Sequence, residues 1–304
     1  MPTRRVFLRT SGAALLGSLA LGARAVAGTV SGPRIARHAL RPRGWPAGFS
    51  LRIAALSDFH ACEPWMSAER IADIAAATNQ LRPDIVLLLG DYVSNHRWIT
   101  RKVPAASWAE ALAGLRAPLG VHAILGNHDW TEDLAAQRSG GGPVFARLAL
   151  EAAGIPVYEN DVLRLAKDGH GFWLAGLADQ RALPLPTRWG KAWRGLDDLD
   201  GTLAKVTDAA PLILMAHEPD IFPRVPERVA LTLSGHTHAG QIRFFGWAPV
   251  VPSVYGSRYL HGHIVEAGPG GLPRDLIVSA GLGCSGVPLR IGAPPEITLV
   301  ELSG

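Results

Sequence analysis

Side chains that can ligate a metal ion recur at the ends of apolar, strand-like runs in this chain. The central example is Gly126-Asn127-His128-Asp129, which follows the run Val121–Leu125 and offers an amide, an imidazole and a carboxylate in succession. Gly126 is expected to let the backbone turn sharply where the strand ends. Such polar side chains are poor material for a protein core, whereas they are ordinary ligands of hard or borderline metal ions.

Four further strand ends carry the same chemistry. They present Asp58 and His60 after Leu51–Ser57, Asp91 after Asp84–Gly90, His217 after Pro211–Ala216, and His236 and His238 after Val229–Ser234. One Asp after a strand is commonly a helix N-cap, and one His is more commonly a packed or surface residue than a ligand. Five such ends in one chain are better explained by a shared site. Mixed oxygen and nitrogen ligands suit Mn, Fe or Zn rather than Ca, and the lack of thiolates among them argues against a closed structural zinc site.

The elements that must position these side chains alternate between strand and helix in the first half of the chain. Ser67 is a candidate N-cap for a helix through about Leu81, and a second helix is expected around Ala105–Leu115. Polar residues at the carboxyl ends of strands in such a βαβα order lie where α/β proteins place their sites.

The second half of the chain is less regular. It predicts helices over Val144–Ala153 and Asp197–Val206, a loop over Gln180–Trp193, and short strands near Ile155–Tyr158, Val162–Leu165, Phe172–Leu177, Gln241–Phe245, His263–Val265, Leu276–Ala280 and Ile297–Leu302. No internal repeat or composition break divides residues 51–304, so one domain is expected there.

The first residues are set aside as an export signal. Arg4-Arg5 precedes an apolar run from Ala13 to Leu21, and Ala25-Val26-Ala27 resembles a cleavage site. The run is too short and too rich in Gly and Ala for a transmembrane anchor, although an uncleaved signal anchor is the alternative. We expect residues 1–27 to be a twin-arginine-type signal peptide that brings the chain to the export machinery, and residues 28–50 to be an irregular lead-in. The expected location is periplasmic or otherwise extracytoplasmic, and membrane association is left open.

Composition and charge narrow the class of partner. The chain has 304 residues, of which 48% are hydrophobic and 18% charged, as in globular proteins with a substantial core. Its net charge is +4, but four arginines and no acids lie in the signal, so the remainder is near neutral. Without a Lys/Arg cluster, binding to nucleic acid is not expected.

In order along the chain, the sequence contains Asp-x-His, Gly-Asp, Gly-Asn-His-Asp, a His after a strand, and Gly-His-Thr-His. This set resembles the calcineurin-like metallophosphoesterases from about Leu51 to the C-terminus. His217-Glu-Pro-Asp220, Gly235–Gln241, Tyr255-Gly256 and Gly281–Arg290 are most similar to an exported or membrane-associated phosphodiesterase branch. The resemblance implies an α/β fold, a four-layer αββα sandwich of two mixed β-sheets flanked by helices.

The resemblance also implies a metal-dependent phosphoric ester hydrolase with two metal ions. One would be held by Asp58, His60, Asp91 and His238, and the other by Asp91, Asn127, His217 and His236, with Asp91 bridging. In such enzymes a hydroxide between the metals attacks phosphorus in line with the leaving oxygen. His128 matches the histidine that stabilises charge or protonates the leaving group, and Asp129 matches the acid that orients this histidine.

One position departs from the family pattern. Many members have Gly two residues after the first His, whereas this chain has Cys62. We hypothesise a disulfide with Cys284, the other cysteine of the chain, against the alternative of two unpaired thiols.

The natural substrate is less well defined by the sequence. Trp65, Trp98, Trp130 and Trp247 lie near the motifs and are candidates to line an amphipathic mouth for a lipid- or cell-envelope-linked phosphoester, or to be packing aromatics. Arg290 is a candidate phosphate contact or a structural ion pair. The alternative activity is a pyrophosphatase acting on nucleotide-activated lipid precursors, and the alternative class is a catalytically silent metal-binding scaffold.

Overall fold

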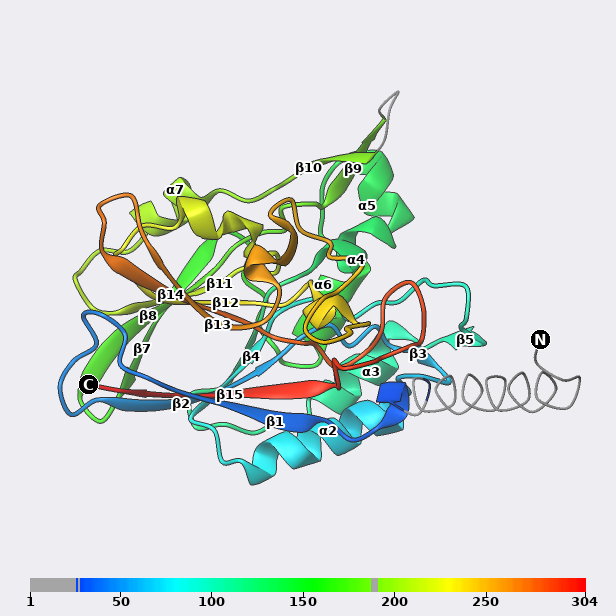
Figure 1. Cartoon of the computed structure of the whole chain (residues 1–304), viewed down its shortest axis with the longest axis horizontal. Coiled ribbons are helices and arrows are strands. Elements are labelled where there is room, and N and C mark those ends of the chain that lie inside the picture. The colour runs from blue at the N-terminus through cyan, green and yellow to red at the C-terminus, as the bar shows by residue number, and fades with distance from the viewer. Residues whose placement is uncertain (1–25, 27, 187–190) are drawn as a thin grey trace, which may run out of the picture.

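The computed structural model describes residue 26, residues 28–186 and residues 191–304, and shows two β-sheets packed face to face with helices outside (Figure 1). From bottom to top in Figure 1, α2, the first sheet, the second sheet and α7 lie in successive layers. The predicted α/β fold with two mixed sheets is confirmed. The predicted signal peptide falls almost wholly outside the described residues.

The first sheet has five strands in the order β1-β15-β2-β4-β6. They are β1 (Arg34–Leu40), β15 (Glu296–Ser303), β2 (Ser50–Leu56), β4 (Ile85–Leu88) and β6 (Val121–Ala123). Strands β2, β4 and β6 are parallel, so their carboxyl ends share one edge of the sheet. The segments that follow these three strands therefore meet at that edge.

The second sheet has six strands in the order β13-β14-β12-β11-β8-β7. They are β13 (Gly262–Ala267), β14 (Pro273–Val278), β12 (Val229–Ser234), β11 (Leu212–Met215), β8 (His170–Gly176) and β7 (Asp161–Lys167). The four central strands are parallel, whereas β13 and β7 pair antiparallel at the two edges. The second sheet therefore also gathers several carboxyl ends at one edge.

Three apolar layers hold the sheets and helices together. Between the sheets, Ile53 and Leu87 belong to the same buried cluster as Leu174 and Leu231. The outer face of the first sheet packs on α2 (Ala68–Gln80), α3 (Ala105–Leu112) and α6 (Phe145–Ala152). The outer face of the second sheet is covered by α7 (Leu199–Ala204) and by the 3-10 helices η1 (Pro219–Arg224) and η3 (Gly256–Tyr259). Strands buried on both faces explain the continuous apolar runs in the sequence.

Four sequence predictions of local structure are wrong. The lead-in predicted as irregular contains β1, whose pairing partner β15 lies more than 250 residues away. The predicted loop at 180–193 contains β9 (Leu183–Pro186), which pairs with β10 (Lys191–Arg194). The strands predicted at 155–158 and 241–245 form only isolated bridges. In the latter segment, positive φ angles at Gln241 and Phe245 prevent an extended strand.

Several short elements complete the edge of the sheets where the site lies. They are β3 (Cys62–Glu63), β5 (Arg101–Lys102), α4 (Asn127–Thr131), α5 (Leu134–Ser139) and the 3-10 helix η2 (His238–Gly240). Among the described residues, no helix has the length and apolar character needed to span a bilayer.

Candidate metal centre

The two sheets bring their carboxyl edges together, and all seven predicted metal ligands lie at this junction. Asp58, His60, Asp91 and Asn127 come from segments after strands of the first sheet, and His217, His236 and His238 from segments after strands of the second. All seven side chains are buried. Residues up to 180 positions apart in the sequence thus share one small volume.

Two glycines allow the strand ends to approach each other. A side chain at Gly90 would place its Cβ 2.5 Å from the backbone nitrogen of Gly126. A Cβ at Gly126 would press on Asp91 Oδ1 and lie 2.8 Å from His217 Cε1. Gly126 itself has an extended backbone, with φ −115° and ψ 176°, so close approach rather than a sharp turn explains this glycine.

The backbone of the ligand residues is locally strained. Five of the seven, namely Asp58, His60, Asp91, His236 and His238, have φ between 47° and 68°. This left-handed region is uncommon for residues with a Cβ, and such strain concentrates at functional sites.

Asp58, His60 and His238 form the first group of converging ligand atoms. Nε2 of His60 lies 3.1 Å from Nε2 of His238, which in turn lies 3.4 Å from Asp58 Oδ1. The Asp58 carboxylate accepts hydrogen bonds from the Ser57 hydroxyl and from His236 N. Burial raises the pKa of Asp58 to about 6.

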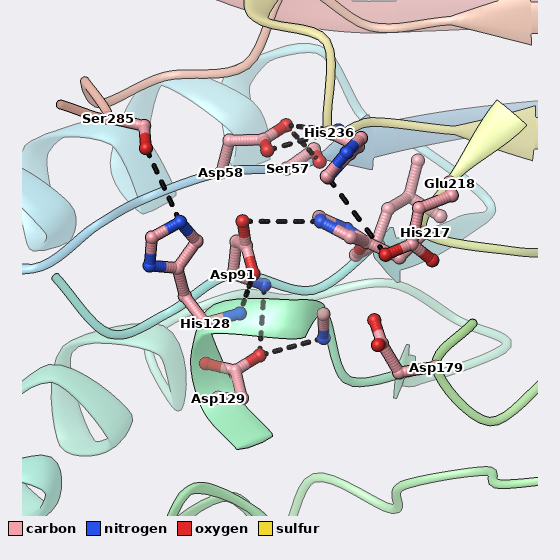
Figure 2. Close-up of polar contacts among 12 residues, drawn as sticks. Ser57, Asp58, Asp91, His128, Asp129, Asp179, His217, Glu218, His236 and Ser285 are labelled. Atoms are coloured by element: carbon pink, nitrogen blue, oxygen red, sulfur yellow. Dashed lines mark hydrogen bonds and ion pairs between the residues drawn. The ribbon is translucent and has the colours of Figure 1, made fainter. Parts of the chain in front are cut away.

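Asp91, His217 and His236 form the second group. Asp91 lies at the centre of the whole site, with Oδ2 3.2 Å from His217 Nε2 and 3.5 Å from His60 Nε2 (Figure 2). Although burial opposes both charges, the imidazolium of His217 lowers the pKa of Asp91, and Asp91 raises the pKa of His217. Asp91 is therefore placed to serve both groups of ligands.

Backbone carbonyl groups fix the orientation of three imidazoles. His60 Nδ1 lies 3.0 Å from Val93 O, and His217 Nδ1 lies 2.7 Å from Leu89 O, so each ring turns Nε2 toward Asp91. His236 is reversed: Nε2 lies 2.9 Å from the carbonyl of Pro252, which leaves Nδ1 for the site. A carbonyl on one ring nitrogen and a metal on the other is the usual environment of a ligating histidine.

His128 forms a third converging group with His60 and Asp91, and its ring makes no hydrogen bond with Asp129. Its Nε2 is 3.3 Å from Ser285 Oγ, and its ring meets that of His60 edge-on at a centroid distance of 4.7 Å. Its backbone N–H donates to Asp91 Oδ1 at 2.8 Å. The predicted partnership of His128 with Asp129 is therefore wrong in this structure, where Ser285 contacts the ring instead.

Asp129 holds the backbone around Asp91. Its carboxylate accepts hydrogen bonds from the N–H groups of Gly126, Asp91 and Tyr92 at 2.8–2.9 Å and of Val93 at 3.2 Å. Burial, with the neighbouring Asp91 charge, raises its pKa to about 7 despite these bonds. The carboxylate thus ties the segment after β4 to the start of α4, and its role is positional.

Two buried carboxylates near His217 were missed by the sequence analysis. Glu218 follows His217 directly, and Asp179 follows β8 by three residues (Figure 2). Glu218 Oε1 and Asp179 Oδ2 have no hydrogen-bond partner, and burial raises the pKa of both groups. The signal for Asp179 was available, because it too is an acid at the end of a buried strand.

Arg181 lines the cavity over the site, whereas Arg290, a candidate phosphate contact or structural ion pair, does not. Arg290 is buried and donates to the carbonyls of Gly283, Ala280 and Ala293, so it is a structural residue that also lies 3.3 Å from His238 Nδ1. Arg181 Nη1 lies 3.0 Å from His236 Nε2. Its guanidinium is 5.2 Å from the ring centroid of Trp193.

The hypothesised disulfide is not formed. Cys62 and Cys284 are buried free thiols, and burial raises the pKa of each. Cys62 Sγ instead lies 3.8 Å from His96 Nε2. High-pKa buried thiols are poor nucleophiles and poor metal ligands, so neither cysteine takes part in the site.

The donor set fits metal ions. Asn127 Oδ1 is a buried atom without a hydrogen-bond partner, and His217 Nε2 makes no hydrogen bond besides its 3.2 Å contact with Asp91 Oδ2; both belong to predicted ligands. Asp58, Asp91, Asp179 and Glu218 bring four buried carboxyl groups to the same volume. Buried charge of one sign needs compensation, and metal ions supply it where carboxylates and imidazoles converge. A cavity of about 400 Å³ is lined by Asp91 and Asn127, with His128 and Arg181 beside them.

Sequence comparison decides the family. Residues 51–240 match the family model described as calcineurin-like phosphoesterase. This chain belongs to that family. Membership makes the chain a metal-dependent phosphoester hydrolase, and the ligand groups described above are its candidate metal centre.

Two relatives of this phosphoesterase align over nearly their whole length. An uncharacterized metallophosphoesterase of Bacillus subtilis, YkuE, is 29% identical over 99% of this chain and 97% of its own. An uncharacterized metallophosphoesterase of Aquifex aeolicus is 27% identical over 89% of this chain and 92% of its own. Among solved structures, the 5'-nucleotidase precursor of Thermus thermophilus aligns with a TM-score of 0.47 and 17% identity, covering 77% of this chain and 50% of that one.

Proposed function

We propose that this phosphoesterase is an exported phosphodiesterase that works with two transition-metal ions, Mn, Fe or Zn. The observation that carries the proposal is the convergence of two ligand groups on Asp91, whose Oδ2 lies within 3.5 Å of a histidine from each sheet. The two ions would be held by Asp58, His60, Asp91 and His238 and by Asp91, Asn127, His217 and His236. Two metal ions so placed activate water and offset charge on a phosphoryl group.

The residues around the centre supply binding and proton transfer. Arg181 reaches over the cavity and is placed to contact a non-bridging phosphoryl oxygen by a charge-assisted hydrogen bond. His128 lines the same cavity and is placed to protonate the leaving oxygen, with Ser285 holding its Nε2 side.

The charge of the cavity supports a diester as substrate. Among its described lining residues, Arg181 is the only Lys or Arg, and the acid Glu132 also lines it. A diester carries one negative charge, whereas a monoester carries close to two at neutral pH. A single cation beside the metal ions suits the smaller charge.

The first test is metal analysis of the mature protein purified from the exported fraction, with hydrolysis of bis-p-nitrophenyl phosphate and p-nitrophenyl phosphate. About two transition-metal ions per chain and preferential diester turnover would support the proposal. A preference for the monoester would retain the metal centre and change the substrate class. No bound metal and no turnover after reconstitution with Mn, Fe or Zn would favour the alternative of a catalytically silent scaffold. Recovery of the chain from the cytoplasm alone would contradict export.

The variant His128→Ala tests proton transfer. We expect turnover of an unactivated diester to fall by about 10²- to 10⁴-fold, because general acid catalysis contributes factors of this size. Metal content should be unchanged, since each of the two proposed ions keeps its four assigned ligands. Full activity of the variant on that substrate would show that His128 does not protonate the leaving oxygen.

A further inference from the structure

A second cavity adjoins the metal centre and has a different character. Its volume is about 340 Å³, which is in the range of small-molecule sites. His238, Pro252 and Ser285 line both this cavity and the one over the metal ligands. The two cavities are therefore direct neighbours, separated only by the side chains that they share.

The side chains that shape this cavity are mostly apolar. Ile242, Pro249, Val250 and Val287 form its walls, and Val250 and Val287 are solvent-exposed at 73% and 37%. No Lys, Arg, Asp or Glu lines it among the described residues. Binding of an apolar group to such a surface is favourable, because it removes apolar area from water.

The polar groups in the lining are already hydrogen-bonded within the protein. Gln241 donates to Val287 O at 2.7 Å and accepts from Ser285 N at 2.9 Å. The Thr237 hydroxyl donates to Leu260 O at 2.7 Å. These side chains have little capacity left to bind a polar ligand, so the cavity selects against sugars and charged groups.

An aromatic turn lies in the segment between Ile242 and Pro249. Phe244 and Trp247 exchange backbone hydrogen bonds of 2.9 and 3.0 Å around a two-residue turn. Phe245 at the tip is fully exposed, and Trp247 is 66% exposed. Exposed apolar side chains grouped beside a cavity commonly mark a binding surface.

We propose that this cavity is the subsite for a hydrocarbon substituent of the phosphoester, so that the substrate is an amphiphile with a phosphoryl group at the metal centre and an alkyl chain between Val250 and Val287. The inference rests on the proposed function, because it requires the phosphoryl group to bind at the metal ligands. A chain longer than the cavity would continue toward the aromatic turn.

The test is binding, measured by isothermal titration calorimetry, of methyl, butyl and hexyl phosphate to the metal-reconstituted protein. Each methylene that leaves water for the cavity should tighten binding about fourfold. Butyl phosphate should thus bind more than about tenfold more tightly than methyl phosphate, with a negative heat-capacity change that grows with chain length.

Matched variants test whether the increase in affinity with chain length arises in this cavity. The double variant Val250→Asn with Val287→Asn replaces the two exposed valines of the cavity. In this variant, the increase in affinity from methyl to butyl phosphate should fall to less than about threefold. Val265→Asn, at a 54% exposed valine on β13, is the control and should keep the full gain. Asparagine adds no charge, so binding of the phosphoryl group to the metals is not changed electrostatically.

The outcomes separate the two proposals. Binding of methyl phosphate without any gain for longer chains would overturn the hydrocarbon subsite and leave the phosphoesterase site standing. Failure of all three monoesters to bind would overturn the hydrocarbon subsite, whereas the phosphodiesterase proposal is tested separately by hydrolysis of bis-p-nitrophenyl phosphate. A chain-length gain that survives in the double variant would place the alkyl chain elsewhere and would also overturn the assignment.

Discussion

At the scale of single residues, the site depends on a few carboxylates whose neighbours decide their roles. Asp91 faces histidines from both sheets, whereas Asp129, also buried, faces four backbone N–H groups. Both side chains are carboxylates, but their roles differ. One is placed to bind metal ions, and the other holds the backbone that presents it.

Replacing Asp129 by Asn should weaken metal binding by about 10- to 100-fold, which is the usual effect of removing a residue that positions a ligand. The amide cannot accept from all four N–H groups as the carboxylate does, so the Asp91 segment loosens. Metal affinity is measured by competition with a chromophoric chelator. Asp133→Asn is the control, because Asp133 is a buried carboxylate that accepts from three N–H groups away from the ligands. An equal loss of metal affinity in both variants would contradict the role of Asp129.

Replacing Arg181 by Met should lower kcat/KM by about 10- to 100-fold, since a hydrogen bond to a charged group contributes roughly 1.5–3 kcal/mol. We expect metal content to be unchanged, because Arg181 contacts Nε2 of His236 and leaves Nδ1 of that ring for a metal ion. The exposed Arg101, replaced in the same way, should retain wild-type kinetics. Wild-type kcat/KM in Arg181→Met would show that the guanidinium does not contact substrate.

At the scale of elements, the site is made by strand ends, and the strands must be held in register by their neighbours. Strand β1 contributes no ligand, but it completes the first sheet by pairing with β15. At the start of this pair, Glu296 is fully buried and contacts Arg34 at 2.9 Å and His261 at 3.0 Å. Although burial opposes ionisation, these partners lower the pKa of Glu296 to about 2.

A depressed carboxyl pKa stabilises the fold above the pKa of the unfolded chain, and the contribution is lost as the pH falls through the folded pKa. For Glu296 the window runs from about pH 4.5 down to about 2. Glu296→Gln should therefore lower the free energy of unfolding at pH 7 by on the order of 2 kcal/mol, and the difference from wild type should shrink toward pH 2. Urea unfolding at several pH values measures this.

The control for Glu296 is on the same strand. Glu301 pairs with Arg52 at 3.2 Å on the surface, with 44% of its side chain exposed. Glu301→Gln should change stability by less than about 1 kcal/mol at any pH, as exposed ion pairs do. If the two variants behaved alike, the buried Glu296 network would not stabilise the β1–β15 pair.

At the scale of the whole molecule, the metal centre joins the two sheets. Four candidate ligands follow strands of the first sheet and three follow strands of the second, and the interface between the sheets is otherwise an apolar layer. Ligands that bind only the folded state stabilise it in proportion to the logarithm of their concentration. A metal ion held by candidate ligands from both sheets would therefore act as a cross-link of the fold.

Removing metal ions by a chelator should lower the Tm by several degrees, because saturation at 100 times Kd adds about 2.7 kcal/mol. Differential scanning calorimetry with and without added Mn measures the shift. Asp91→Asn, which removes the shared ligand, should show a much smaller response. A Tm that is independent of metal in a protein shown to bind two ions would contradict the cross-linking role.

The chain by itself determined which chemistry lies at the strand ends. Apolar runs followed by Asp, Asn and His identified all seven candidate ligands, and three of these runs are the buried strands β4, β11 and β12. Local spacing suffices for this, because side-chain pattern and turn chemistry are properties of neighbouring residues.

Only the tertiary structure decided which atoms meet. It paired β1 with β15, turned Asp129 toward backbone N–H groups, buried Arg290 and brought Arg181 and Asp179 to the metal centre. It also placed an apolar cavity against the metal ligands, with walls from segments around Val250 and Val287. Each of these depends on contacts between residues far apart in the sequence, where spacing along the chain carries no information about distance or direction.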